Sequence, residues 1–263
     1  MIEFALFGAG RIGKIHAANL ARQPGARLKY VVDMHAPAAQ ALAHAHGAEA
    51  ADVERALGDA TVQAVVIASS TDTHAGLIVA AANAGKAVFC EKPIDLTVAR
   101  SRECAEAVRR NGVTCMIGFQ RRFDPTFAAL KARVERGEIG EPEMLIVTIR
   151  ARRGLLCQIN TSRRAAYGYD QRVELLGSKG MLQAGNVRPT EVTAWSAGGI
   201  ATDVPEPFFL ERYRQAYAAE IAHFVGALRD GAPVRTTIDD GLAALELAEA
   251  AMTSWRTGQV VDA

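Results

Sequence analysis

The chain has 263 residues with 30 basic and 29 acidic side chains, so its formal net charge is +1. This balance argues against nucleic acid or an anionic membrane as the main ligand. The hydrophobic fraction of 49% excludes general disorder, and no apolar run reaches the ~18 residues that cross a bilayer. Four scattered cysteines without a C-x-x-C pair indicate reduced thiols in a cytoplasmic protein, with no metal site expected.

Short β-branched runs alternate with Ala-rich stretches of helical spacing through the first 118 residues. The runs with strand character cover residues 2–7, 28–32, 64–67, 87–90 and 113–117. The helical stretches between them cover residues 11–21, 37–45, 74–84 and 96–110. This alternation predicts βαβ units, and therefore a doubly wound α/β parallel sheet with helices on both faces.

The periodicity changes after about residue 118. Asp124 followed by Pro125 predicts the start of a helix that ends near Arg136. Strand-like runs at 144–150, 155–161, 171–176 and 191–195 follow, with a turn at 177–180 and long amphipathic helices at 208–228 and 239–255. We therefore predict two domains, residues 1–118 and residues 119–263. The second is a shortened α+β domain of mainly antiparallel strands, whose C-terminal helices can pack back on the first.

A glycine-rich G-x-G-x-x-G motif separates the first expected strand from the first expected helix. Its residues are Gly8, Ala9, Gly10, Arg11, Ile12 and Gly13. In this context Gly8 allows the tight turn, Gly10 lets the backbone approach a pyrophosphate, and Gly13 lets the helix pack on the strand. The pyrophosphate would lie on the free N–H groups of the helix N-terminus. The alternative is a glycine-rich turn that only packs.

Asp33 ends the second expected strand, twenty positions after Gly13. A carboxylate at this place accepts hydrogen bonds from the adenosine ribose hydroxyls and repels a 2′-phosphate. We therefore predict a Rossmann domain with NAD, and not NADP, as its cofactor. An ordinary strand-end or helix-capping aspartate is the alternative.

Several further segments carry a resemblance to a known family. With the glycine motif, A-S-S-T-D-T-H at 68–74 and C-E-K-P at 90–93 resemble the Gfo/Idh/MocA oxidoreductases, in which E-K-P follows the fifth strand. The family is named for glucose–fructose oxidoreductase, inositol dehydrogenase and rhizopine catabolism. The segments that resemble its inositol 2-dehydrogenase branch are G-F-Q-R-R-F-D-P at 118–125, S-R-R-A-A-Y-G-Y-D-Q-R at 162–172 and F-L-E-R-Y at 209–213.

This resemblance implies oxidation of a secondary alcohol of a cyclic polyol or sugar, with hydride passed to NAD. Lys92 matches the catalytic lysine that holds the reacting hydroxyl, where its charge stabilises the developing alkoxide. Arg121 and Tyr167 are expected to bind the substrate. The expected cofactor contacts are Gly8, Gly10, Arg11, Ile12, Gly13, Asp33, Ser69, Thr71, His74, Glu91, Lys92 and Gln120, the last at a position where the family varies.

One part of the family pattern is missing. The family carries an Asp and, four residues later, a His that serves as general base, but none of the six histidines here follows an aspartate at that spacing. Only residues 151–154 separate two strand-like runs that flank the helix carrying this pair in the family. We expect a tight hairpin in place of roughly seventy residues, about half a domain.

Two functions are therefore compatible with the sequence. The first is an NAD-dependent polyol or sugar dehydrogenase whose activity is impaired unless Tyr167, a water or a neighbouring subunit supplies a base. The second is a non-catalytic, degenerate family member that binds NAD. The resemblance also implies a homo-oligomer assembled through the open face of the second-domain sheet, and the shortened sheet leaves the number of subunits undecided.

Overall fold

The computed structural model describes residues 1–140, 142–150, 156–159 and 165–262. The chain divides into two compact units, one made of Met1–Phe119 with Tyr217–Ala263 and the other of Gln120–Ala216. The first unit is therefore discontinuous in sequence. Within the described ranges, none of the helices combines the length and the apolar character that a bilayer span requires.

A parallel six-stranded sheet with the order β3-β2-β1-β4-β5-β6 forms the centre of the first unit. Its strands are β1 (Ile2–Phe7), β2 (Ala26–Val32), β3 (Glu49–Ala50), β4 (Val62–Ile67), β5 (Ala87–Glu91) and β6 (Cys115–Gly118). The expected doubly wound sheet is confirmed. Apolar runs produce it because the central strands are covered on both faces. The strand order reverses between β1 and β4, and open α/β sheets bind their ligands outside the carboxyl ends of the strands at such a reversal.

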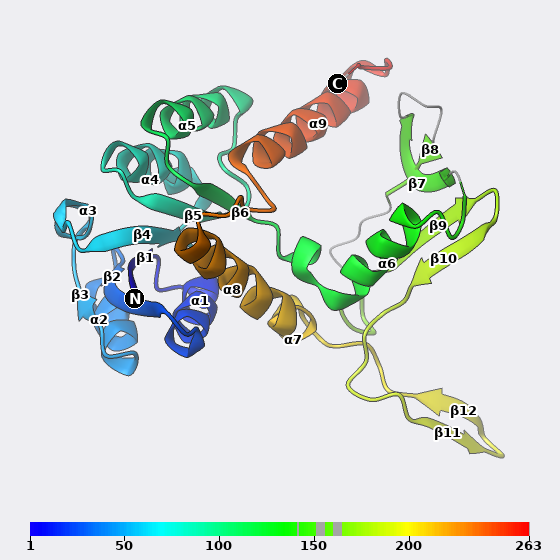
Figure 1. Cartoon of the computed structure of the whole chain (residues 1–263). Helices are drawn as coiled ribbons and strands as arrows, with labels where there is room; N and C mark the ends of the chain where they lie inside the picture. Colours follow the sequence, from blue (N-terminus) through cyan, green and yellow to red (C-terminus); the bar gives the residue numbers. More distant parts are fainter. Residues whose placement is uncertain (141, 151–155, 160–164, 263) are drawn as a thin grey trace. The chain divides into compact units, whose positions relative to one another are not determined.

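Helices cover both faces of this sheet (Figure 1). They are α1 (Arg11–Arg22), α2 (Ala36–Ala45), α3 (Val53–Gly58), α4 (Thr71–Asn83), α5 (Val98–Asn111), α8 (Arg214–Asp230) and α9 (Ile238–Thr257). Helices α4, α5 and α9 lie on one face and α1, α2 and α8 on the other. Phe224 of α8 contacts Phe4 and Phe89 of the sheet. The helix expected at 208–228 is interrupted at Tyr213, so the short α7 (Phe209–Arg212) precedes α8.

The segment before α9 pairs with the outer strand β6. Ile117 N donates to Thr236 O at 2.8 Å, and the Thr236 hydroxyl donates back to Ile117 O at 2.6 Å. Met116 and Thr237 form an antiparallel bridge. The outer edge of the sheet is thus covered by residues more than a hundred positions later in the chain, which protects it from pairing with another molecule.

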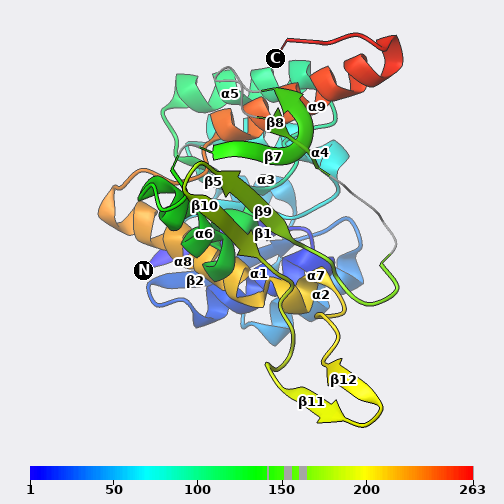
Figure 2. The same ribbon diagram turned by 90° about the vertical axis from the view of Figure 1, so that its right-hand side faces the viewer.

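The second unit contains the 3-10 helix η1 (Gln120–Phe123), α6 (Pro125–Glu135), a four-stranded sheet and a separate hairpin. The sheet has the order β10-β9-β7-β8, and its strands are β7 (Pro142–Arg150), β8 (Leu156–Cys157), β9 (Val173–Gly177) and β10 (Gly180–Ala184). The hairpin joins β11 (Thr193–Ser196) to β12 (Gly199–Thr202). Figure 2 shows the two antiparallel pairs, β9 with β10 and β11 with β12. Antiparallel pairing predominates, as expected.

Two local expectations in this unit have different outcomes. The expected start of α6 is confirmed, because the Asp124 carboxylate caps the helix by accepting from Thr126 N and Phe127 N, both at 3.1 Å. The expected tight hairpin between β7 and β8 stays a prediction, because the two strands pair in irregular register and the residues of the turn are not among those described. Residues 151–154, where the shortened connection was located, lie outside the described residues.

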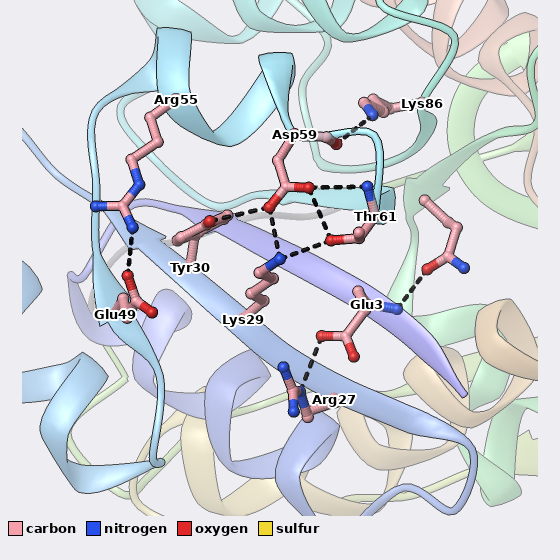
Figure 3. Close-up of polar contacts among 10 residues, drawn as sticks. Glu3, Arg27, Lys29, Tyr30, Glu49, Arg55, Asp59, Thr61 and Lys86 are labelled. Carbon is pink, nitrogen blue, oxygen red and sulfur yellow. Dashed lines mark hydrogen bonds and ion pairs between the residues drawn. The ribbon is translucent and has the colours of Figure 1, made fainter.

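A polar network joins three strands of the first unit near the amino ends of β4 and β5 (Figure 3). The Asp59 carboxylate accepts from Lys29 Nζ at 2.6 Å, from the Tyr30 hydroxyl at 2.9 Å and from Thr61 N at 2.8 Å. Lys86 Nζ donates to the carbonyl of Asp59 at 2.8 Å. The Lys29 ammonium is the main cause that holds the pKa of Asp59 well below its usual range. This network lies toward the amino ends of β4 and β5, whereas the glycine motif follows the carboxyl end of β1.

Candidate active site

The three motif glycines have different surroundings. Gly8 has φ +106°, and a Cβ there would lie 2.5 Å from Ala68 O. A Cβ on Gly13 would lie 1.9 Å from Gly8 O, whereas a Cβ on Gly10 would meet no described atom within 4 Å. The first and third glycines therefore allow close backbone packing, and the second leaves open space where a pyrophosphate can approach.

The amino end of α1 is suited to an anion. Gly10 is its N-cap, no side chain in the described part of the chain caps it, and its first turn holds no acidic residue. Arg11 and Ile12 occupy that turn. The first N–H groups of a helix lack helical partners and carry its positive dipole end, so they can bind a phosphate group. The residues present thus fit the pyrophosphate of NAD.

Asp33 is bonded to the glycine motif itself. Its Oδ2 accepts from Ala9 N at 2.7 Å, and its Oδ1 accepts from His35 N at 2.8 Å. Each carboxylate oxygen has further acceptor capacity for a ribose hydroxyl. The side chain therefore holds the glycine motif in place and lies beside it.

The loop after β4 and the first turn of α4 contain three of the expected cofactor residues. Thr71 begins α4, and the Ser69 hydroxyl lies 2.7 Å from that of Thr73. His74 is buried, with Nδ1 2.8 Å from Pro93 O and Nε2 3.1 Å from Ser69 O. The His74 ring thus ties this loop to the E-K-P segment, a structural task that the sequence did not reveal.

The E-K-P segment leaves the carboxyl end of β5. The Lys92 side chain is exposed, and the Lys92–Pro93 peptide bond is cis. Glu91 points inward, with Oε1 2.8 Å from His16 Nε2. Gly118 makes room for this carboxylate, since a Cβ there would lie 3.3 Å from Glu91 Oε1. The two side chains of this segment therefore point to different surroundings.

A third buried group completes a cluster that sequence reasoning missed. Glu220 of α8 is fully buried, and one ligand atom from each of His16, Glu91 and Glu220 lies within 4.8 Å of the others. Burial, followed by the charge of Glu91, raises the pKa of Glu220 well above its usual value, against the opposing effect of Lys92. One sequence signal could have found it: Glu220 is a lone carboxylate among the apolar positions of an otherwise buried helix face.

The remaining expected residues belong to the second unit. Gln120 is buried in η1, and Arg121 Nε donates to the Tyr213 hydroxyl at 3.1 Å. Tyr167 is half-exposed, and its hydroxyl donates to Asp170 Oδ2 at 2.5 Å. None of the six histidines of the sequence falls within Gln120–Ala216, so this unit has no imidazole that could serve as base.

Two family models cover the chain between them. The oxidoreductase family with an NAD-binding Rossmann fold matches residues 2–119, and the oxidoreductase family C-terminal alpha/beta domain matches residues 113–263. The inositol 2-dehydrogenase of Rhizobium meliloti is 36% identical over 318 residues, with 96% of each chain covered. The myo-inositol 2-dehydrogenase of Thermotoga maritima is 32% identical over 320 residues, again with 96% of each covered.

Solved structures agree with these relatives. A putative myo-inositol dehydrogenase from Sinorhizobium meliloti superposes with a TM-score of 0.91 at 34% identity, and 100% of both chains is covered. A myo-inositol dehydrogenase from Corynebacterium glutamicum gives 0.93 at 36% identity, with 98% of both covered. The first sequence alignment spans 318 positions against the 263 residues of this chain, so the relative contains internal residues without counterpart here. The chain belongs to the Gfo/Idh/MocA oxidoreductases, with their NAD-binding Rossmann fold and C-terminal alpha/beta domain.

Proposed function

We propose that this protein is an NAD-dependent dehydrogenase that oxidises a secondary hydroxyl of an inositol or a related cyclic polyol. The observation that carries the proposal is the 36% identity, over 96% of both chains, to a relative named inositol 2-dehydrogenase. The open space at Gly10 and the carboxylate of Asp33 support NAD as the cofactor. A cytoplasmic location and a homo-oligomer belong to the same proposal, and the free cysteines support the former.

The proposal divides the work between two parts of the chain. Residues 1–118 supply most of the NAD site and the catalytic lysine, and residues 119–263 supply the other polyol contacts and join subunits. The cofactor is held by Gly8, Gly10, Arg11, Ile12, Gly13, Asp33, Ser69, Thr71, His74, Glu91, Lys92 and Gln120. Arg121 and Tyr167 bind substrate hydroxyls, which suits their donor groups.

Lys92 carries the chemistry in this proposal. Bound NAD supplies the acceptor for the hydride. The ammonium of Lys92 holds the reacting hydroxyl and stabilises the negative charge that grows on its oxygen. The hydroxyl proton must also leave, and a positioned base typically contributes ~10²–10⁴ to the rate. The lack of a histidine in the second unit therefore supports slow turnover that increases with pH, because the hydroxyl proton is then lost more readily to hydroxide in the solvent.

The test is an NAD titration followed by a turnover assay on protein whose intact mass is verified. We expect NAD to bind, and NADH to form from myo-inositol or another member of a cyclic polyol panel, faster at alkaline pH. The matched control is Lys92→Ala, which should still bind NAD but form no NADH. If no polyol yields NADH at high enzyme concentration and alkaline pH, the dehydrogenase proposal fails.

A second candidate is a non-catalytic NAD-binding protein. It is favoured by one observation, the internal residues that the Rhizobium relative has and this chain lacks. It predicts a rise in thermal midpoint with NAD, no turnover, and no effect of Lys92→Ala beyond affinity. The same titration and assay therefore separate the two candidates.

A further inference from the structure

The hairpin of β11 and β12 is left uncovered by the described part of its own chain. Among the described strands the two pair with each other alone and form a separate sheet, apart from β9 and β10 (Figure 2). All eight of their residues are exposed. A two-stranded hairpin on its own is marginally stable in water, so this one needs a further surface to hold its shape.

Hydrogen bonds at the base of the hairpin attach it to the rest of the second unit. The Thr190 hydroxyl donates to Asp203 Oδ2 at 2.5 Å. Glu206 N donates to Val187 O at 3.0 Å, and Tyr169 N donates to Glu206 O at 2.8 Å. The hairpin thus extends from an ordered base, and binding to it has to order few additional residues.

The exposed side chains of the hairpin include large apolar groups. Trp195 is 75% exposed and Ile200 is 62% exposed. The two residues are directly opposite each other in the strand pairing, so their side chains lie on the same face. Val192 and Val204 flank the strands and are exposed as well. Such a patch indicates a binding surface, and tryptophan is prominent among the residues that dominate interface energies.

The charges around the hairpin restrict what can cover it. Residues 192–202 contain no charged side chain and no proline, and no basic residue occurs between positions 189 and 204. A nucleic acid or an anionic membrane would require basic groups. Both strand edges also lack the charges and prolines with which proteins protect exposed edges. An uncharged, unprotected edge is suited to pairing with another uncharged edge.

The same hairpin of a second copy provides such an edge. In an antiparallel pairing of two β11 strands centred on Ala194, Glu191 lies opposite Ala197 of the second copy. The corresponding pairing of two β12 strands, centred on the third residue, places Asp203 opposite Gly199. Like charges therefore do not face each other directly in either pairing. Either pairing also extends two strands to four, a number that can be stable where two are not.

We propose that the β11–β12 hairpin is an arm that joins two copies of this chain, hairpin to hairpin, across a two-fold axis. Such an axis brings the same patch of both copies together, so the Trp195 side chains of both copies become buried in one interface. This inference deepens the proposed homo-oligomer by naming its contact surface. It does not depend on the proposed dehydrogenase activity.

Sedimentation velocity of the full chain over a wide concentration range tests the arm. We expect the native protein to associate, and Trp195→Ala to dissociate at a concentration at least about tenfold higher. Trp255→Ala is the matched control, because Trp255 is the other tryptophan of the chain, is 77% exposed and lies in the first unit. It should associate like the native protein. Far-ultraviolet circular dichroism verifies that both variants are folded.

A charge on the strand edge provides a second comparison. Ala194→Lys adds a positive charge to the arm of each copy and leaves Trp195 in place, so it should weaken association as Trp195→Ala does. Val260→Lys adds the same charge at a residue of the first unit that is 94% exposed, and should leave association unchanged.

Tryptophan fluorescence follows the arm without altering it. Trp255→Phe leaves Trp195 as the single tryptophan. We expect its emission to shift to the blue, and its quenching by iodide to decrease, as the protein concentration rises through the range of association. A Trp195 that stays open to solvent in the associated protein would contradict the arm.

Two further results would overturn the inference, and they differ in what else they affect. A native protein that stays monomeric at every concentration would also remove the proposed homo-oligomer and would leave the hairpin to a different partner. Unchanged association in both Trp195→Ala and Ala194→Lys would keep the homo-oligomer but place its interface elsewhere. None of these measurements requires NADH formation, so absence of turnover would count against the dehydrogenase alone.

Discussion

At Asp33 one carboxylate accepts from Ala9 N and carries its charge beside the glycine motif. Asp33→Asn keeps an oxygen that can accept from Ala9 N but removes the charge. Hydrogen bonds to charged groups contribute ~1.5–3 kcal/mol, so NAD should bind roughly tenfold to a hundredfold more weakly. NADP should gain relative to NAD because the repulsion of its 2′-phosphate is gone. Calorimetric titrations of both cofactors measure this, and an unchanged preference would contradict the role of Asp33.

Lys92 is the second residue whose role can be isolated. Lys92→Met removes the ammonium from an exposed position and leaves the packing of β5 intact. We expect kcat to fall ~10²–10⁴-fold, because the developing alkoxide loses its stabilising charge. NAD affinity should change less than about threefold, since most expected cofactor contacts remain. Steady-state kinetics and NAD titration separate the two effects, and Lys92→Arg tests whether charge without the same geometry suffices.

At the scale of an element, the turn from β1 into α1 separates packing from binding. Gly13→Ala places a Cβ 1.9 Å from Gly8 O, so the turn must deform and the thermal midpoint should fall by several degrees. Gly10→Ala meets no described atom within 4 Å and should melt like the native protein, yet bind NAD at least tenfold more weakly because the methyl group occupies the space of the pyrophosphate. Melting curves and NAD titrations of the pair measure this. Equal affinities in Gly10→Ala and the native protein would count against the phosphate site.

In the loop before β9, three side chains donate hydrogen bonds to one carboxylate. Asp170 accepts from Arg172 Nε at 2.8 Å, from the Tyr167 hydroxyl at 2.5 Å and from Asn186 Nδ2 at 3.0 Å. Arg172, followed by Tyr167, lowers the pKa of Asp170 from 3.8 to about 2. Its contribution to stability is therefore present above pH 3.8 and is lost as pH falls toward about 2. Asp170→Asn should melt below the native protein near neutral pH, and melts down to about pH 2 should show the difference disappearing.

Local patterns predicted most elements but not those that depend on distant partners. The strands β1, β4 and β5 follow from continuous apolar runs, and α6 from the capping aspartate before Pro125. The two-residue β3 is too short to show a pattern. The strand β12 is exposed throughout, so burial imposes no alternation on it. The break at Tyr213 falls inside an amphipathic stretch and has no local signal.

The same distinction applies to the site. The glycine motif and Asp33 could be found because a strand–turn–helix unit has fixed spacing. His16, Glu91 and Glu220 could not be joined from sequence, since they lie in three separate elements that only the fold brings together. The buried ring of His74, between two carbonyl oxygens, has the same explanation.

For the whole molecule, cofactor binding should appear as stability. A ligand that binds only the folded state stabilises it by ~2.7 kcal/mol at a concentration of 100 Kd. We expect NAD to raise the thermal midpoint of the native protein, and NADP at the same concentration to raise it less. Differential scanning fluorimetry over a range of both cofactors measures this. Equal shifts with NADP would show that Asp33 does not select against the extra phosphate.

The segment that pairs with the outer edge of β6 is synthesised long after the strand itself. Ile117 is bonded to Thr236, which is synthesised 119 residues later. At ~5–20 residues per second, a ribosome takes roughly 6–24 s to deliver that partner. Throughout this interval the nascent chain presents an unpaired strand edge, so translation speed and chaperone supply determine how much of the protein reaches its native state.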